Sequence, residues 1–211
     1  MNTQVLPAGE PQTIHRAQRF LSSGRMVAFP TDTVYGVGAH AFSPEAVAAL
    51  FAAKNRPTTK AIPILVARIE DMARVAHPVP TIAWRLAERF WPGGLTLVLP
   101  CVEEIPSIVT AGGDTVALRC PDHAVPLALI NALGAPLAAT SANLSGQASP
   151  TSADQVVEQL KGRVPLVIDG GQCPVRVSST VIDLSVSPPR LLRAGAIPTE
   201  KLNDLLPDLT S

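Results

Sequence analysis

The segment FPTDTVYGVG (residues 29–38) leads through a helical stretch into KNRPTTKAIPILV (residues 54–66), and this combination predicts an α/β fold. The first segment ends the apolar strand pattern Met26–Phe29 in a turn rich in hydroxyl groups and glycine. Between the segments, Ser43-Pro44 matches an N-cap followed by proline at the first helical position, so a helix is expected to reach about Lys54. The second segment enters a strand of buried type, Ile62–Ala67.

The rest of the chain continues to alternate between helical and strand patterns. Further helices are expected over Pro11–Ser23, Thr81–Phe90, Ala124–Leu133, Thr151 or Ser152 to about Lys161, and Pro198–Leu206. Further strands are expected over Leu95–Leu99, Thr115–Cys120, Pro136–Thr140, Val164–Ile168, Ser179–Leu184 and Arg190–Arg193. Several strands follow one another without a helix between them, which indicates a mixed, twisted sheet with helices packed on it. We expect one domain over residues 8–206.

The composition describes a globular, rather apolar chain. Hydrophobic residues make up 46% of the 211 residues, and 17 basic residues balance 17 acidic ones. A zero net charge argues against strong nonspecific binding of nucleic acid, although a local basic face stays open. The three cysteines show no C-x-x-C spacing, so neither a metal site nor a disulfide framework is indicated. Without a signal segment or an apolar run of about 20 residues, the chain is expected to be cytoplasmic and not bound to a membrane.

Three cations lie within seven residues of this neutral chain: Lys54, Arg56 and Lys60. Beside a turn of threonine and glycine, they suggest a site for an anion, with phosphate as the first candidate. The alternative is a favourable positive charge at a helix C-terminus followed by a solvated loop. No Gly-Lys dipeptide occurs, so the chain has no Walker A loop.

Other polar residues follow strands, where ligands bind in open α/β sheets. Thr31 and Thr33 flank Asp32 after a strand, either as ligand contacts or as a turn that satisfies its own backbone. Arg119 lies in the apolar strand TVALRC and needs an anionic partner, which is either a structural carboxylate or the carboxylate of a ligand.

Small hydroxyl residues gather in SANLSG (residues 141–146) and around Ser149. They would let backbone N–H groups approach a phosphate or an adenosine, or they form a polar loop that caps the next helix. Ser179 opens a later strand and Arg193 closes another, and both could also be ordinary edge residues.

Seven motifs in order resemble the threonylcarbamoyl-AMP synthase family of the YrdC/Sua5 type: PTDTVYGVG, KNRP, WPGGLT, VALRCP, TSANLSG, SSTVID and LLRAG. The resemblance implies a twisted open sheet with a large concave cavity. It also implies a nucleotidyltransferase that joins L-threonine, bicarbonate or CO2, and ATP into L-threonylcarbamoyl adenylate and pyrophosphate. Partner proteins of the family then transfer the group to N6 of adenosine 37 in tRNA (t6A). The chain resembles the short form, without the C-terminal Sua5 domain.

The resemblance also implies roles for individual residues. The threonine substrate would be held by Thr33, Arg119, Ala139 and Ser179. ATP would be held by Arg56, Lys60, Thr115, Ser141, Asn143, Ser149 and Arg193. Lys54, Arg56 and Lys60 would form the catalytic cations, and Mg²⁺ would enter on the ATP phosphates without protein ligands of its own.

Three positions depart from the family pattern. Asn55 stands where glycine is common, Lys60 where long members have asparagine, and Leu65 where many members have a histidine near threonine. Leu65 keeps open a paralogue with another amino-acid acceptor. An RNA-binding module of the same fold, or direct binding of tRNA beside catalysis, is a further alternative.

Overall fold

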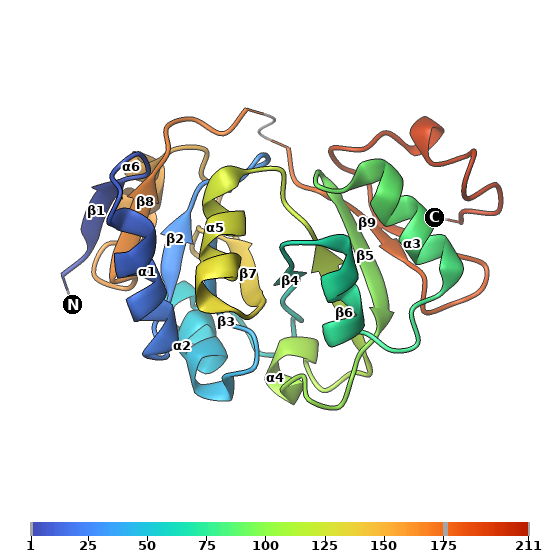
Figure 1. Cartoon of the computed structure of the whole chain (residues 1–211), viewed down its shortest axis with the longest axis horizontal. Helices are drawn as coiled ribbons and strands as arrows, with labels where there is room; N and C mark the ends of the chain where they lie inside the picture. Colours follow the sequence, from blue (N-terminus) through green and yellow to red (C-terminus); the bar gives the residue numbers. More distant parts are fainter. Residues whose placement is uncertain (1, 175–176, 211) are drawn as a thin grey trace.

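The computed structural model describes residues 2–174 and 177–210. One sheet of ten strands runs through the described chain in the order β1-β8-β2-β3-β7-β4-β6-β5-β9-β10 (Figure 1). The strands are β1 Gln4–Pro7, β2 Val27–Phe29, β3 Gly36–His40, β4 Ile64–Leu65, β5 Leu95–Pro100, β6 Thr115–Arg119, β7 Leu137–Ser141, β8 Leu166–Asp169, β9 Thr180–Asp183 and β10 Arg190–Arg193. The helices are α1 Thr13–Ser22, α2 Pro44–Lys54, α3 Thr81–Phe90, α4 Ser107–Thr110, α5 Ala124–Leu133 and α6 Ala153–Leu160, with 3₁₀ helices η1 Ile69–Arg74 and η2 Thr199–Lys201.

The sheet is mixed, as predicted. Strand β8 pairs in parallel with β1 and β2, and the pairs β4–β6 and β5–β9 are also parallel. The central pairs β2–β3, β3–β7 and β4–β7 are antiparallel. The sheet is therefore mixed and open, with flanking helices. A purely parallel sheet would instead require strictly alternating βαβ units.

Both faces of strand β2 are buried. Val27 and Phe29 belong to a cluster with helices α1 and α5, whereas Ala28 between them belongs to the larger core that includes α2 and α6. This alternation follows from the two-residue period of a strand. Helices α1 and α5 lie side by side over one face (Figure 1). No helix in the described ranges is long and apolar enough to cross a membrane.

Strand β3 was missed by the sequence analysis, which treated its glycines as part of a turn. Gly36 pairs with Phe29 and Gly38 with Val27. A Cβ atom at either glycine would lie 3.1 Å from a carbon of the Phe29 ring. The glycines therefore leave room for an aromatic ring against the neighbouring strand, which is a packing reason that a propensity for turns does not reveal.

The signals that begin helix α2 are confirmed. The Ser43 side chain accepts a hydrogen bond from the Ala46 N–H at 3.2 Å, and Pro44 occupies the first turn. Asn55 follows the helix with φ 51°, in the left-handed region. Because glycine and asparagine are the residues that tolerate this conformation best, Asn55 can stand where the family pattern has glycine.

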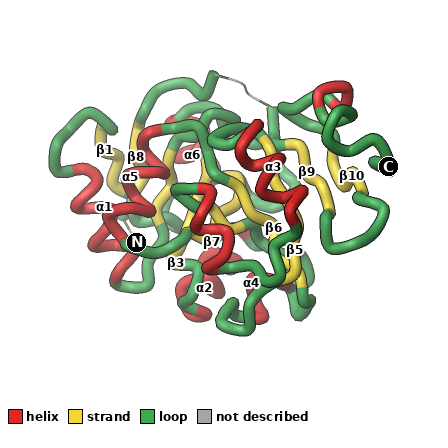
Figure 2. Tube along the Cα trace, turned by 45° about the vertical axis from the view of Figure 1, so that its right-hand side comes forward, coloured by secondary structure: helices red, strands yellow, loops and turns green. Residues whose placement is uncertain are grey.

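The predicted closing helix Pro198–Leu206 is wrong in type and length. Only Thr199–Lys201 is helical, as the 3₁₀ helix η2, and the chain then continues in turns (Figure 2). Leu202 and Leu206 are buried, so the apolar spacing is real. The intervening Asn203 and Asp204 favour turns, because their side chains compete for backbone hydrogen bonds.

Candidate active site

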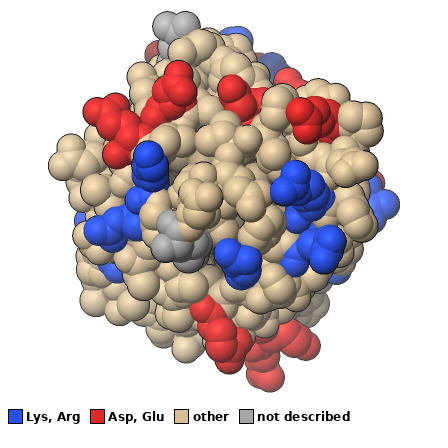
Figure 3. Space-filling view, turned by 90° about the vertical axis from the view of Figure 1, so that its left-hand side faces the viewer, with Lys and Arg blue, Asp and Glu red and all other residues tan. Residues whose placement is uncertain are grey.

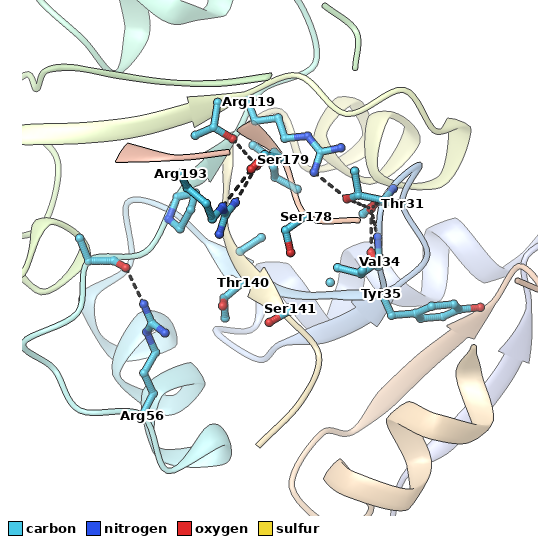
Figure 4. A pocket seen from close by; sticks show the side chains of 17 residues that line it. Thr31, Val34, Tyr35, Arg56, Arg119, Thr140, Ser141, Ser178, Ser179 and Arg193 are labelled. Carbon is cyan, nitrogen blue, oxygen red and sulfur yellow. Dashed lines mark hydrogen bonds between the residues drawn. The ribbon is translucent and has the colours of Figure 1, made fainter. Parts of the chain in front are cut away.

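A pocket of ≈ 330 Å³ opens where the loop after β2 meets residues of β4, β5, β6, β7 and β10 (Figure 4). Three arginines face it, and none of its lining residues is acidic. The lining residues are Thr31, Thr33, Val34, Tyr35, Gly36, Arg56, Ala61, Pro63, Leu65, Thr96, Arg119, Ala139, Thr140, Ser141, Ser178, Ser179 and Arg193. A small, positively charged pocket of this kind suits an anionic ligand.

Arg119 ends strand β6 inside a dense hydrogen-bond network. Its Nη2 donates to both oxygens of Asp32, at 2.6 and 2.7 Å. Its Nη1 donates to Thr33 Oγ1 at 2.8 Å, and its Nε donates to the Gly93 carbonyl at 2.9 Å. The structural carboxylate is therefore present. Since a guanidinium has five N–H groups, at most two remain for a ligand in the pocket.

The Asp32 carboxylate favours the charged form of Arg119. Burial lowers the pKa of Arg119, and the neighbouring Asp32 carboxylate opposes that shift. The two side chains are only 9% and 10% exposed. Their arrangement fixes the direction of the guanidinium while leaving it beside the pocket.

The turn after β2 satisfies its own polar groups and also presents a hydroxyl. Thr31 Oγ1 donates to the Val34 carbonyl at 2.7 Å and accepts from the Thr33 N–H at 3.1 Å. Because the Thr31 proton is used, Thr33 must donate in the hydroxyl pair that joins them at 3.0 Å. The turn therefore satisfies its own backbone, and Thr33 also lines the pocket.

A second network holds Ser179 and Arg193. The Arg193 guanidinium donates to the Ser179 carbonyl and to Ser179 Oγ, both at 2.9 Å. Thr96, on β5, forms a 2.7 Å hydrogen bond with the same hydroxyl. Burial and the nearby charge of Arg119 lower the pKa of Arg193. Thr96 was not predicted as a site residue, because a lone threonine in an apolar strand carries no signal of its own.

Close backbone approach positions this second network. Gly195 lies directly against the residues before β9, and a Cβ atom there would lie 2.3 Å from the Ser178 carbonyl oxygen. At Gly94 a Cβ atom would lie 2.6 Å from that of Ala196. The glycines of WPGGLT and LLRAG therefore let the chain near Arg193 pack against the start of β5.

Arg56 faces the same pocket from the other side, below Arg193 in Figure 4. Its Nη2 donates to the Ala61 carbonyl at 2.8 Å and its Nε to the Lys60 carbonyl at 3.3 Å. Burial lowers the pKa of Arg56. Among the described residues no carboxylate pairs with Arg56 or Arg193. An anion between them would supply the missing countercharge.

Lys54, one of the predicted catalytic cations, is buried within the fold. Its side chain is 1% exposed, and it does not line the pocket. The ammonium donates to the carbonyls of Ser141 and Asn143, the latter at 2.6 Å. Burial, assisted by the charge of Arg56, lowers the pKa of Lys54 to about 7. Lys54 thus anchors the turn after β7.

Asn143 belongs to the anchored turn. Its Nδ2 donates to the carbonyls of Leu144 and Gln147, both at 2.8 Å. Its Oδ1 is buried and has no hydrogen-bond partner within the described part of the chain. The side chain braces the loop from inside, beside Ser141, which lines the pocket.

The structure gathers seven of the predicted site residues around the pocket: Thr33, Arg56, Arg119, Ala139, Ser141, Ser179 and Arg193. The remaining predicted residues, Lys54, Lys60, Thr115, Asn143 and Ser149, are not among the lining residues. Lys60 is exposed, and Thr115 lies at the opposite end of β6 from Arg119. Leu65 lines the pocket, at the position where the family pattern has histidine.

Known proteins are similar to this chain in sequence and fold. A family model described as "Telomere recombination" (Sua5/YciO/YrdC) matches residues 19–195. Threonylcarbamoyl-AMP synthase of Pyrococcus abyssi is 46% identical over 200 residues, which cover 95% of this chain and 59% of that protein. The protein of the same name from Bacillus subtilis is 44% identical over 205 residues, with 97% and 59% covered.

A solved structure extends the comparison to three dimensions. The structure titled P. abyssi Sua5 complexed with L-threonine aligns with a TM-score of 0.95 and 43% identity, covering 100% of this chain and 63% of that one. In both comparisons with the curated relatives, the chain spans 59% of the relative's length. Motifs and fold agree, and the chain belongs to the Sua5/YciO/YrdC family.

Proposed function

We propose that the chain is a nucleotidyltransferase that makes L-threonylcarbamoyl adenylate and pyrophosphate from L-threonine, bicarbonate or CO2, and ATP. The observation that carries the proposal is the convergence of Arg56, Arg119 and Arg193 on one pocket without an acidic lining residue. All the reactants except CO2 carry negative charge, which these guanidiniums would offset. The names of the curated relatives support the same activity.

The end of the pocket near Arg119 is the proposed threonine site. The free N–H groups of Arg119 would hold the substrate carboxylate, with Thr33 and Ser179 beside it. Leu65 and Ala139 form an apolar wall that fits the methyl group of threonine. The P. abyssi structure solved with L-threonine supports a threonine site in this family.

The opposite end is the proposed ATP site. Arg56 and Arg193 would contact phosphates, and Ser141 would contribute its hydroxyl. Lys60, Thr115, Asn143 and Ser149 stay as predicted ATP residues outside the lining of the pocket. We assign Lys54 a positioning role, because its ammonium is held by the carbonyls of the turn that carries Ser141. Mg²⁺ would arrive on the ATP phosphates, bound by them and by water.

The proposed chemistry needs no protein nucleophile. The neutral amine of threonine attacks CO2, forms an N–C bond and loses a proton, which gives a carbamate. A carbamate oxygen then attacks the α-phosphorus of ATP, the bond from the α-phosphorus to the bridging oxygen breaks, and pyrophosphate leaves with the electron pair. Fixed guanidiniums would stabilise the negative charge that grows on the phosphoryl oxygens. Positioning and electrostatics would therefore supply most of the rate.

The product would serve tRNA modification. Threonylcarbamoyl adenylate is a mixed anhydride, so separate transfer proteins would move its acyl group to N6 of adenosine 37. This step would occur in the cytoplasm, where tRNA is processed. The same partners were expected from the resemblance of the sequence.

The decisive experiment measures pyrophosphate release with each substrate left out in turn. We expect release only when ATP, threonine and bicarbonate are all present. Release that continues without bicarbonate would contradict the proposal. Replacing threonine by serine, valine and other amino acids tests the alternative of a paralogue, since Leu65 lines the acceptor pocket. Faster turnover of another amino acid would reassign the acceptor.

A further inference from the structure

Two threonine hydroxyls lie between Arg119 and the backbone of the turn after β2. Thr31 and Thr33 both line the pocket, and they are only 4% and 1% exposed. Thr33 belongs to the proposed threonine site, whereas Thr31 has no role in it beyond the turn. The direction of each hydroxyl proton follows from the donors and acceptors around the pair, because some of these groups can only donate and others can only accept.

The protons of the pair can point in only one way. The carbonyl of Val34 can only accept, so the proton in its 2.7 Å contact with Thr31 Oγ1 belongs to Thr31. The 3.0 Å contact between the two hydroxyls must then use the proton of Thr33. Arg119 Nη1 can only donate, and it occupies one lone pair of Thr33 Oγ1 at 2.8 Å. Thr33 Oγ1 therefore keeps one lone pair and no proton for a ligand.

The other hydroxyl of the proposed threonine site is not fixed in this way. Ser179 Oγ accepts from Arg193 at 2.9 Å, but its 2.7 Å contact with Thr96 can use the proton of either side chain. Ser179 can therefore donate to a ligand or accept from it. Thr33, in contrast, offers a ligand only an acceptor, so the pocket selects the polarity of the group that meets Thr33.

We propose that Thr31 is a positioning residue that makes Thr33 a strict acceptor for the side-chain hydroxyl of the amino-acid substrate. The inference rests on the proposed function, in which the substrate carboxylate lies on Arg119. The side-chain hydroxyl then donates to Thr33, and the neighbouring methyl group lies against the apolar wall of Leu65 and Ala139. An amino acid without a donor at this position leaves a buried lone pair unpaired, which lowers its affinity.

The amine of threonine fits this lone pair less well than the hydroxyl does. In the proposed reaction the amine forms a bond to CO2, and the resulting carbamate attacks the α-phosphorus. The phosphates are assigned to the end of the pocket that carries Arg56, across from Arg119 in Figure 4. An amine held by Thr33 would lie at the wrong end. The hydroxyl is therefore the donor that remains for Thr33.

Two pairs of amino acids of matched shape test the polarity of Thr33. L-Valine replaces the hydroxyl of L-threonine by a methyl group, and L-isoleucine replaces the ether oxygen of O-methyl-L-threonine by a methylene group. Affinities are measured by isothermal titration calorimetry without ATP or bicarbonate. Wild type should bind threonine about 5–100-fold more tightly than valine, because valine leaves the lone pair unpaired. It should bind O-methylthreonine no more tightly than isoleucine, because an ether cannot donate.

Three variants separate the direction of the proton from the integrity of the fold. In T31V the Thr33 proton loses its acceptor and is free to donate, so O-methylthreonine should bind at least about fivefold more tightly than isoleucine. T31S keeps a hydroxyl and should keep both wild-type ratios. T13V is the matched control, because the buried Thr13 hydroxyl also donates to a carbonyl, that of Pro7, at 2.8 Å.

The control lies away from the pocket and should keep both wild-type ratios. Thr13 begins helix α1, and no residue of this helix lines the pocket. Helix α1 lies on the left of Figure 1, at the end of the molecule that faces the viewer in Figure 3. A change of the ratios in T13V like that in T31V would overturn the proposal, because loss of any buried threonine hydroxyl would then suffice.

A purely structural role of Thr31 gives a different result. It would weaken all four ligands alike in T31V and leave both ratios unchanged, which would overturn the proposal. Failure of T31V to prefer the ether, through equal affinity or through absence of binding, would overturn it as well. If T31V does not fold, wild type decides alone. A wild-type preference for O-methylthreonine over isoleucine, or equal affinity for threonine and valine, would refute the strict acceptor.

Pyrophosphate release separates this inference from the proposed function. If wild type binds the amino acids with the expected ratios but releases no pyrophosphate from ATP, threonine and bicarbonate, only the proposed reaction is contradicted. If release requires all three substrates but threonine and valine bind equally, only the role of Thr31 is contradicted.

Discussion

Replacing Asp32 by asparagine removes the charge that compensates Arg119 while preserving side-chain size. Arg119 Nη2 lies 2.6 and 2.7 Å from the two carboxylate oxygens of Asp32, and the side chains of the pair are 9% and 10% exposed. Removing one partner of such a buried pair costs about 3–5 kcal/mol, because the other charge stays buried without compensation. For a domain of this size, that loss lowers Tm by about 6–20 °C.

The chain offers a matched control in the pair of Arg89 and Asp204. Its atoms are 3.5 Å apart, and its side chains are 50% and 73% exposed. Since an exposed pair contributes about 0–1 kcal/mol, D204N should lower Tm by less than about 4 °C. The measurement is thermal and urea unfolding followed by circular dichroism, with KM for threonine from pyrophosphate release. D32N should also raise this KM, whereas D204N should not.

A double variant completes the cycle. In D32N/R119M neither side chain of the pair is charged, so part of the stability lost in D32N should return. The reasoning fails if D32N is no less stable than D204N. It also fails if D32N/R119M is less stable than D32N, because the penalty would then not come from the unpaired guanidinium.

Three further predictions concern the pocket and its support. R56A should lower kcat for pyrophosphate release by about 10²–10³ with threonine binding mostly kept, whereas K60A should lose less, because Lys60 is exposed outside the lining. T96V should raise KM for threonine about 2–10-fold, because Ser179 Oγ loses its 2.7 Å hydrogen bond. K54M should flatten the pH dependence of urea unfolding, since the Lys54 pKa is about 7 in the folded chain and 10.5 unfolded. Between these values the unfolded chain binds more protons, so wild-type stability should rise with pH.

A specific result would contradict each of these three predictions. If R56A and K60A reduced the rate of pyrophosphate release equally, a place in the lining of the pocket would not distinguish the catalytic cation from an exposed one. An unchanged KM in T96V would mean that the Ser179 hydroxyl does not need Thr96. Identical pH slopes for wild type and K54M between about pH 7 and 10 would mean that burial does not shift the Lys54 ammonium.

Local chemistry explains which elements could be predicted. Ser43 and Pro44 act within the first turn of helix α2, so local sequence suffices to place its start. Strand β3 depends on the Phe29 ring packing on Gly36 and Gly38, a contact between strands that residue propensities do not contain. The closing helix was mispredicted because apolar spacing alone does not choose between a helix and a series of turns.

The candidate site also has some features that the sequence predicts and others that depend on tertiary contacts. The sequence by itself determined the set of motifs, their order and the charges that a family member needs, because these belong to residue identity and spacing. Only the tertiary structure decided that Arg119 is already paired with Asp32, that Thr96 supports Ser179, and that Lys54 holds carbonyls. The physical reason is that a cation in a folded chain satisfies the nearest buried acceptor, and distant segments of the chain supply that acceptor.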